Sequence, residues 1–210
     1  MGMRLFTYFR SSAAFRVRIA LNLKGLKPEQ VFVHLRKKEQ GAEQYRALNP
    51  QALIPTLVHE GHAIGQSLAI IEYLDEIVPR PALLPADTLG RARVRQMAYA
   101  VACEIHPLNN LRVLNYLRET LGRSEEEILA WQRHWMALGF AATEALAGPG
   151  RFCHGDAPSL ADICLIPQLA NARRAEMDLA PYPTLLRIER AAFELPAFVE
   201  ALPKNQPDAE

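Results

Sequence analysis

One segment near the start of the chain, residues 9–21, constrains the fold most, because it joins two kinds of element through a turn that carries two serines. Residues 4–9 are mostly apolar and aromatic and predict a short strand. Residues 15–21 alternate in polarity as a half-buried strand would, but they also fit a buried helix. Serines placed to cap a helix, alanines after them and Gly25 placed to end it favour the helix.

The start of such a helix is a favourable place for an anion. Its first turn carries unpaired N–H groups and a partial positive charge of about +0.5, which stabilise a phosphate or a sulfur anion. A hydroxyl of Ser11 or Ser12 can also donate a hydrogen bond to a thiolate, which lowers the pKa of a bound thiol from its reference value of about 8.5. The two serines are also explained as helix caps alone; the turn by itself favours that explanation, while leaving the binding of an anion open.

Residues 10–25 closely resemble the signature of the zeta class of glutathione transferases, the maleylacetoacetate isomerases. They read Arg-Ser-Ser-Ala-Ala-Phe-Arg-Val-Arg-Ile-Ala-Leu-Asn-Leu-Lys-Gly. The chain departs from the family at Ala13, where the family has a cysteine, and at Phe15, where it has a tryptophan. The resemblance places on Ser11 the serine on which the glutathione sulfur depends most. The missing cysteine puts in doubt a role for a second sulfur, but not the activation of glutathione by serine.

Composition argues against several other functions. There are 24 basic and 23 acidic residues, and no basic cluster is interleaved with aromatic residues, so nucleic acid is not an expected partner. No apolar stretch approaches the roughly 18 residues of a membrane span, and residues 1–6 lack the apolar run of a signal peptide. The widely separated Cys103, Cys153 and Cys164 suit neither a disulfide framework nor a zinc site, and they predict small core residues in a reducing cytoplasm.

The first part of the chain mixes strands and helices. The expected elements in order are a strand at 4–9, a helix after residue 12, a strand at 30–35, a short helix ending near 49, a hairpin at 54–64 and a helix at 67–77. Strands of this order build a thioredoxin-like half, although only the resemblance supplies that name, because the pattern permits other α/β arrangements.

A proline-rich linker at residues 79–87 separates this part from a stretch with no convincing strand. Helices are predicted at 91–121, 124–146, 159–174, 184–193 and 196–201, and a frayed tail at 203–210. The third of these helices opens with Ser159 and Asp162 in capping-box spacing. We therefore expect a thioredoxin-like α/β domain at 1–80 that binds glutathione and an all-helical domain at 88–210 that contributes the substrate site, which is the glutathione transferase architecture.

The resemblance also assigns glutathione contacts in the first domain. Only about 5–6% of X–Pro bonds are cis, yet thioredoxin-like glutathione binders have a cis proline where Pro55 stands, and it turns the backbone of the residue at Ile54 toward the cysteinyl part of glutathione. Gln66 and Ser67 match the family segment that holds the γ-glutamyl end, and Ser67 is also expected to be a helix N-cap. The further polar contacts implied are Gln40 and Gln51.

In the helical domain, Pro107 lies inside a long predicted helix, where it predicts a kink. His106 and Asn110 are four residues apart and therefore share one face of that helix. A lone histidine on a helix is more often structural, but the Pro-Leu-x-Asn-Leu neighbourhood borders glutathione in zeta enzymes, so the resemblance assigns His106, Asn110 and Arg112 to glutathione binding. No second histidine or carboxylate is spaced for a metal, and no metal is expected.

Two arginines are candidates for binding substrate carboxylates. Arg10 immediately precedes Ser11, and Arg174 matches the arginine of a similar family segment. Guanidinium groups pair bidentately with carboxylates, and a dicarboxylate requires more than one positive group. A solvated surface role is the alternative for Arg174. Arg16 and Arg18 are expected on the helix surface or in pairs between the domains.

The resemblance implies a glutathione-dependent cis–trans isomerase of maleyl compounds, with maleylacetoacetate as the expected substrate, in aromatic amino-acid breakdown. Ser11, Ser12 and Arg10 are the expected catalytic residues. A cytoplasmic homodimer that binds glutathione and a small dicarboxylate is expected on the same grounds.

Three alternatives stay open. A maleylpyruvate isomerase is close, although Leu111, where an arginine would add a carboxylate contact, favours the longer substrate. A transferase acting on small α-halo acids would use the same thiolate. A non-catalytic module that binds protein would not need the serine turn, Ile54–Pro55 and Gln66–Ser67 all intact, as they are here.

Overall fold

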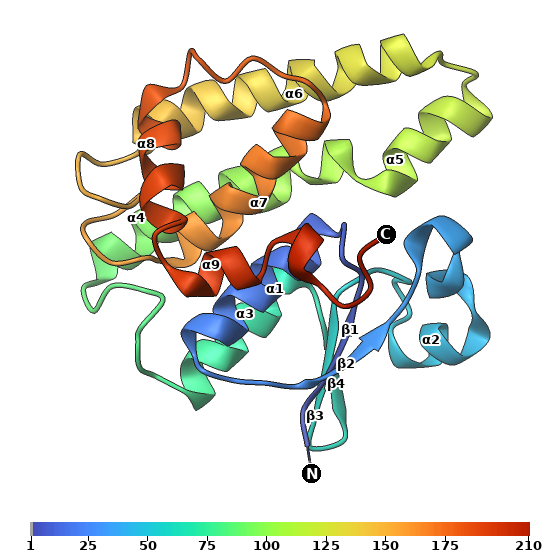
Figure 1. Cartoon of the computed structure of the whole chain (residues 1–210), viewed down its shortest axis with the longest axis horizontal. Helices are drawn as coiled ribbons and strands as arrows, with labels where there is room; N and C mark the ends of the chain where they lie inside the picture. The colour runs from blue at the N-terminus through green and yellow to red at the C-terminus, as the bar shows by residue number, and fades with distance from the viewer. Residues whose placement is uncertain (1) are drawn as a thin grey trace. The chain divides into compact units, whose positions relative to one another are not determined.

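A computed structural model of the chain describes residues 2–210 and divides into two compact units, drawn in Figure 1. The first unit runs to Leu83 and includes Phe193–Glu210, and the second is Leu84–Ala192. The domains predicted from the sequence, 1–80 and 88–210, differ from these units chiefly because residues 193–210 group with the first unit.

The first unit is built on a mixed sheet of four strands in the order β2-β1-β3-β4. The strands are β1 (Arg4–Thr7), β2 (Glu29–Phe32), β3 (Thr56–His59) and β4 (His62–Gly65). β1 is parallel to β2, and β3 is antiparallel to both β1 and β4. The two-residue turn of the hairpin has φ of 51° at Glu60 and 83° at Gly61, as turns that match the strand twist require. The predicted order of strands and helices is confirmed.

The helices of this unit follow from local signals in the sequence. They are α1 (Ser12–Leu23), α2 (Glu43–Leu48), α3 (Ser67–Ile77), α9 (Pro196–Glu200) and the short 3-10 turns η1 (Leu35–Lys37), η2 (Glu39–Gly41) and η6 (Pro203–Asn205). α1 supplies the crossover that the parallel pair β1–β2 needs. Its C-cap is followed by Gly25, whose φ is +66°. α3 and α9 both pack against α1.

Burial of α1 corrects the prediction for its two arginines. Arg16 and Arg18 are 2% and 3% exposed. Arg16 donates to Oγ of Ser67, and Arg18 donates to Thr7, Tyr8, Phe9 and Ala201, all residues of the first unit. They are therefore buried, and the prediction that they lie on the helix surface is wrong. Packing of α3 and α9 on α1 covers positions that a helix on one face of a sheet would leave exposed.

All the regular secondary structure described in the second unit is helical. Its elements are α4 (Thr88–Tyr99), the π segment η3 (Ala100–Ile105), the 3-10 turn η4 (Pro107–Asn109), α5 (Leu111–Asn115), the π segment η5 (Tyr116–Thr120), α6 (Glu125–Leu146), α7 (Leu160–Arg174) and α8 (Pro183–Ala192). The long helix predicted at 91–121 is thus divided. Pro107 lacks the N–H group that a continuous helix would need there. A new helix, α5, then begins after Asn110, whose side chain caps it by accepting from the N–H of Arg112.

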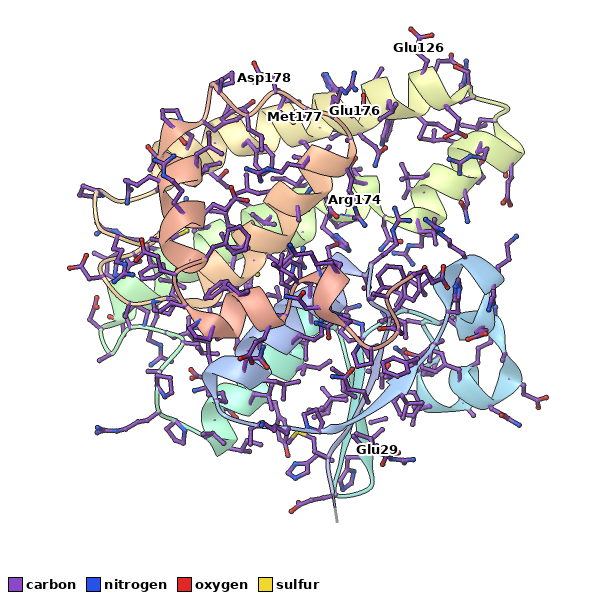
Figure 2. The ribbon with its side chains drawn as sticks, viewed as in Figure 1. Glu29, Glu126, Arg174, Glu176, Met177 and Asp178 are labelled. Carbon is purple, nitrogen blue, oxygen red and sulfur yellow. The ribbon has the colours of Figure 1, made fainter. Side chains whose placement is uncertain are left out.

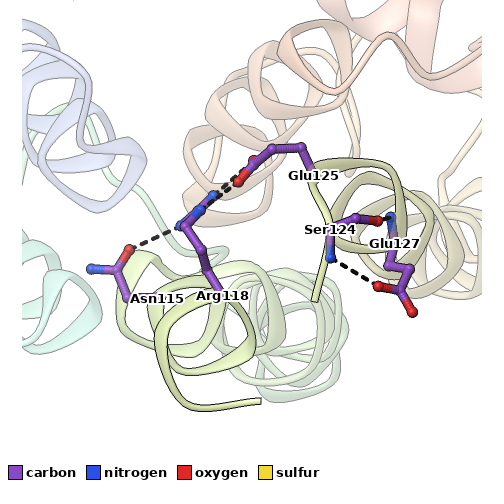
Figure 3. Close-up of polar contacts among 5 residues, drawn as sticks. All are labelled: Asn115, Arg118, Ser124, Glu125 and Glu127. Carbon is purple, nitrogen blue, oxygen red and sulfur yellow. Dashed lines mark hydrogen bonds and ion pairs between the residues drawn. The ribbon is translucent and has the colours of Figure 1, made fainter. Parts of the chain in front are cut away.

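The turn between η5 and α6 is fixed by polar contacts shown in Figure 3. The Arg118 guanidinium donates to both oxygens of Glu125, at 2.5 and 2.9 Å, and to Oδ1 of Asn115 at 3.2 Å. Ser124 and Glu127 form a reciprocal capping box at the start of α6. The predicted capping box at Ser159 is also present, at the start of α7.

Two further predictions, for the end of the chain and for one cysteine, are wrong. Residues 203–210 are not frayed, because Gln206 is buried and its Nε2 donates to the carbonyls of Glu200 and Leu202 at 2.8 and 3.0 Å. Cys103 is exposed, whereas Cys153 and Cys164 are buried as predicted. Within residues 2–210, no helix has the length and apolar character needed to cross a bilayer.

Candidate functional site

Ser11 is the N-cap of α1, as the sequence predicts. Its backbone is extended, with φ of −70° and ψ of 115°, and its Oγ accepts a hydrogen bond from the N–H of Ala14 at 3.2 Å. A hydroxyl has one hydrogen and two lone pairs. Because the cap uses a lone pair, the hydrogen of the Ser11 hydroxyl is left to donate to an anion at the positive end of the helix.

The neighbours of Ser11 differ in exposure. Arg10 is half-buried and immediately precedes it in the chain. Ser12 is buried, with 7% of its surface exposed, as the first residue of α1. Ser11, which is half-buried, therefore presents the more accessible hydroxyl of the pair.

The start of α3 differs from the prediction in its cap. Gln66 occupies the N-cap position with φ of +65° and ψ of 118°, a conformation that L residues rarely adopt, and its side chain makes no cap bond. Ser67 is the first helical residue, so its prediction as N-cap is wrong. Its buried Oγ instead accepts from Nη1 of Arg16 at 3.3 Å. Gln66 Nε2 donates to Oε1 of Gln51 at 2.7 Å, which brings two predicted glutathione contacts together.

The Ile54–Pro55 bond is cis, as the resemblance implies, and it lies just before β3. Two residues that sequence reasoning missed hold this loop. The hydroxyl of Tyr45 and Nδ2 of Asn49 both bond to the carbonyl of Leu53, at 2.7 and 2.9 Å. Burial raises the pKa of Tyr45, and hydrogen bonding with its side-chain neighbours partly offsets the effect. No sequence signal reveals these anchors, because residues 45–49 form an ordinary short helix and its end.

Gln40 offers a hydrogen-bond acceptor that the protein does not use. It lies in η2, and its Oε1 is buried with no hydrogen-bond partner in the described part of the chain. Leaving such an acceptor unpaired costs about 1–3 kcal/mol. An N–H group of a peptide-like ligand would remove that cost, so the donor and acceptor set of this unit fits glutathione.

In the second unit, the structure brings His106 and Asn110 together. The Nδ2 of Asn110 lies 3.5 Å from Nε2 of His106, and Oδ1 of Asn110 accepts from the N–H of Arg112 at 3.2 Å. The π segments η3 and η5 lie on either side in the sequence, and π turns are frequent at functional sites. Arg112 is exposed. Among residues 2–210, no group of three or more His, Cys, Asp or Glu residues is placed to hold a metal ion.

Arg174 is exposed in the last turn of α7, where Figure 2 labels it. Its Nη2 donates to Oδ1 of Asn171. The adjacent Arg173 differs, because both of its terminal nitrogens pair with the carboxylate of Glu189 in α8. Arg173 therefore joins two helices, whereas Arg174 presents its guanidinium at the surface of the second unit.

A further carboxylate near the serine turn was missed by sequence reasoning. Asp208 Oδ2 accepts from the backbone N–H of Phe9 at 2.9 Å. The two residues are 199 positions apart, and the polar segment that carries Asp208 looks like a frayed end in the sequence.

Comparison with known proteins gives consistent matches over the whole chain. The models of the glutathione S-transferase N-terminal domain and of the glutathione S-transferase C-terminal domain match residues 1–76 and 114–200. A protein named probable maleylacetoacetate isomerase, from Vibrio cholerae, is 47% identical, over 100% of this chain and 99% of that protein.

Two solved structures are similar in both sequence and fold. One is described as the holo structure of maleyl pyruvate isomerase, a bacterial glutathione S-transferase in zeta class; it is 49% identical with a TM-score of 0.97, over 99% of this chain and 100% of that one. The other, maleylacetoacetate isomerase from Anaeromyxobacter dehalogenans 2CP-1 with bound dicarboxyethyl glutathione and citrate in the active site, is 46% identical with a TM-score of 0.88, over 100% of this chain and 98% of that one.

Proposed function

We propose that the chain, which belongs to the glutathione S-transferase family, is a glutathione-dependent cis–trans isomerase of maleyl compounds. The resemblance to the zeta class and the expected pairing of a thioredoxin-like domain with a helical domain are confirmed. Relatives at 46–49% identity over nearly their full length carry the names maleylacetoacetate isomerase or maleylpyruvate isomerase, which supports the proposed reaction.

The observation that carries the proposal is the position of the Ser11 hydroxyl. It caps α1 through its oxygen and keeps its hydrogen for an anion at the positive end of the helix. When bound, glutathione supplies a thiolate that adds to the cis double bond and leaves after the resulting single bond has rotated. The proposed task of Ser11 is to stabilise that sulfur as an anion, which lowers the pKa of the thiol.

Other residues of the first unit are assigned to holding glutathione in place. Gln66 and Gln51, which are hydrogen-bonded to each other, stand at the start of α3, where a carboxylate is favoured. The buried Oε1 of Gln40 is the proposed acceptor of an N–H of the ligand. The backbone of Ile54 before the cis proline is the proposed partner of the cysteinyl part. In the second unit, His106, Asn110 and Arg112 keep their assignment as glutathione contacts.

The proposed substrate is a dicarboxylate, and Arg10 and Arg174 are its proposed partners. Guanidinium groups bind carboxylates through two parallel hydrogen bonds, and they also stabilise the enolate charge that develops as the double bond is attacked. Dicarboxyethyl glutathione and citrate in the Anaeromyxobacter dehalogenans relative are polycarboxylates of the kind that such a pair would bind. Ser12 keeps its assignment as a second catalytic hydroxyl.

Maleylpyruvate is the second candidate substrate, because the maleyl pyruvate isomerase structure has the higher identity, 49%. Leu111 at the exposed start of α5 favours maleylacetoacetate instead, because an arginine there would add a carboxylate contact for the shorter acid. A cytoplasmic location, a homodimer and a place in aromatic amino-acid breakdown stay predictions of the resemblance.

Isomerisation of the two maleyl substrates by purified protein tests the proposal. Loss of the cis-dienoate absorbance is followed with and without glutathione. We expect turnover that requires glutathione and a higher kcat/KM for maleylacetoacetate. Equal rates without glutathione would contradict the proposed mechanism, and a higher kcat/KM for maleylpyruvate would reverse the choice of substrate.

A further inference from the structure

The backbone that leads into Ser11 is held by two side chains from distant parts of the first unit. The Arg18 guanidinium donates to the carbonyl of Tyr8 at 3.4 Å and to that of Phe9 at 3.1 Å. From the other direction, Oδ2 of Asp208 accepts from the N–H of Phe9 at 2.9 Å. Both polar groups of the Phe9 backbone are therefore bonded to charged side chains.

Arg18 is fixed in turn by its surroundings. It is 3% exposed, and it also donates to Oγ1 of Thr7 at 3.3 Å and to the carbonyl of Ala201 at 3.2 Å. Burial lowers the pKa of Arg18 to about 10, and the carboxylate of Asp208 acts in the opposite direction. The guanidinium is thus charged at neutral pH, and it pairs electrostatically with Asp208 across the Phe9 backbone.

Asp208 lies in a segment that is anchored before and after it. On one side, Gln206 donates to two carbonyls near the end of α9. On the other, Oε1 of Glu210 lies 2.6 Å from Nε2 of His34. The Nδ1 of that ring accepts from the N–H of Lys37, so in the neutral ring Nε2 carries the hydrogen and donates to Glu210. The carboxylate of Asp208 is therefore presented to Phe9 by an ordered segment.

We propose that Asp208 is a positioning residue for the Ser11 hydroxyl, and that it acts by fixing the backbone of Phe9. Few bonds separate Phe9 from Ser11. The N–H of Ser11 donates at 3.0 Å to the carbonyl of Tyr8, and Arg18 donates to the same carbonyl. Displacement of Phe9 changes both anchors of the turn and hence the direction of the Ser11 O–H bond. This inference rests on the proposed function, and it adds a residue whose proposed action runs through the protein backbone.

The test compares Asp208→Ala, which removes the acceptor, with Asp208→Asn, which keeps an oxygen for the N–H of Phe9. Glu200→Gln is the matched control, because it neutralises an exposed carboxylate of α9. The readout is the pKa of the glutathione thiol in its complex with each protein, from the ultraviolet absorbance of the thiolate as a function of pH. Glutathione affinity, kcat and thermal stability are measured on the same samples.

We expect Asp208→Ala to raise the pKa of the bound thiol by about one unit and to lower kcat about tenfold, since one unit is a tenfold change in the thiolate equilibrium. Asp208→Asn should fall between Asp208→Ala and wild type, because a hydrogen bond to a neutral acceptor is about half as strong. Glu200→Gln should match wild type.

A bound thiol with the wild-type pKa in both Asp208 variants would overturn the inference. If Asp208→Ala does not fold, Asp208→Asn decides alone, and a wild-type pKa in that variant overturns the inference equally. A wild-type complex in which the thiol keeps its free-solution pKa would instead reject the proposed function. The two failures are therefore distinguishable before any substrate is added.

Discussion

Ser11→Ala separates two tasks that one hydroxyl performs through different atoms. The oxygen accepts from the N–H of Ala14 at 3.2 Å and so caps α1, while the hydrogen is the proposed donor to the glutathione sulfur. The first task contributes to folding, and the second contributes only when the thiolate is present. The substitution should therefore change stability and turnover by different amounts.

The two magnitudes follow from the two bonds. Loss of a serine N-cap to alanine costs about 1 kcal/mol of folding free energy. Loss of a hydrogen bond to a charged partner costs about 1.5–3 kcal/mol, which is about 10- to 150-fold in rate. Ser11→Gly is the matched control, because glycine at an N-cap costs only a few tenths of a kcal/mol. Ser11→Gly should thus lose turnover as Ser11→Ala does and lose less stability.

Urea unfolding followed by far-ultraviolet circular dichroism gives the stability of the three proteins, and initial rates of isomerisation at saturating glutathione give kcat. If Ser11→Ala turns over at the wild-type rate, the proposed role of the Ser11 hydroxyl is wrong. If the rate of each variant instead falls in proportion to its stability, the hydroxyl serves the fold and not the thiolate.

Three further predictions concern the second unit. Arg174→Ala should raise KM for the dicarboxylate about tenfold with a smaller effect on kcat. The control Arg173→Ala, which removes an ion pair with Glu189, should leave KM unchanged. An equal KM in wild type and Arg174→Ala would assign Arg174 a surface role only. Burial by itself would raise the pKa of Glu144, but hydrogen bonds from N–H groups at the start of α8 outweigh it and hold the pKa below its ordinary value of 4.5. The stability that Glu144 contributes is then present above pH 4.5 and lost as pH falls through its folded pKa. Wild type should therefore be more stable than Glu144→Gln at pH 7, the two should converge in acid, and a constant difference across pH would refute this. Asp162→Ala should lower the unfolding free energy by about 3 kcal/mol, because two backbone N–H groups and a hydroxyl lose their acceptor, and thermal unfolding close to that of wild type would refute it.

Local signals in the sequence predict most of the first unit. The order of strands and helices follows from periodicity and turn residues, and the capping role of Ser11 follows from its place before a run of helix formers. The helix α3 ends where Pro79 requires. These features depend on neighbours within a few residues, which is the range over which a single sequence is informative.

The predictions that failed depend on contacts between distant residues. Arg18 is buried because carbonyls of residues 8, 9 and 201 surround its guanidinium. Asp208 is held in place by the hydrogen bond that its Oδ2 accepts from the N–H of Phe9, 199 positions away. The Oγ of Ser67 accepts a hydrogen bond from Arg16 in α1 and does not cap α3, the helix that begins at Ser67. No pattern in a single sequence encodes which distant groups meet.

The resemblance supplied what neither periodicity nor spacing could. The cis bond at Ile54–Pro55 contradicts the base rate for X–Pro bonds, and only the family pattern predicted it. The hydrogen bond between Gln66 and Gln51 and the approach of Asn110 to His106 join residues that the resemblance assigns to glutathione. The roles of these residues toward glutathione stay predictions.

A crystal structure of the protein soaked with glutathione tests the central claim most directly. We predict that the glutathione sulfur lies within hydrogen-bonding distance of Oγ of Ser11, at the amino end of α1. A sulfur bound elsewhere, with the Ser11 hydroxyl directed only at the N–H of Ala14, would contradict the account.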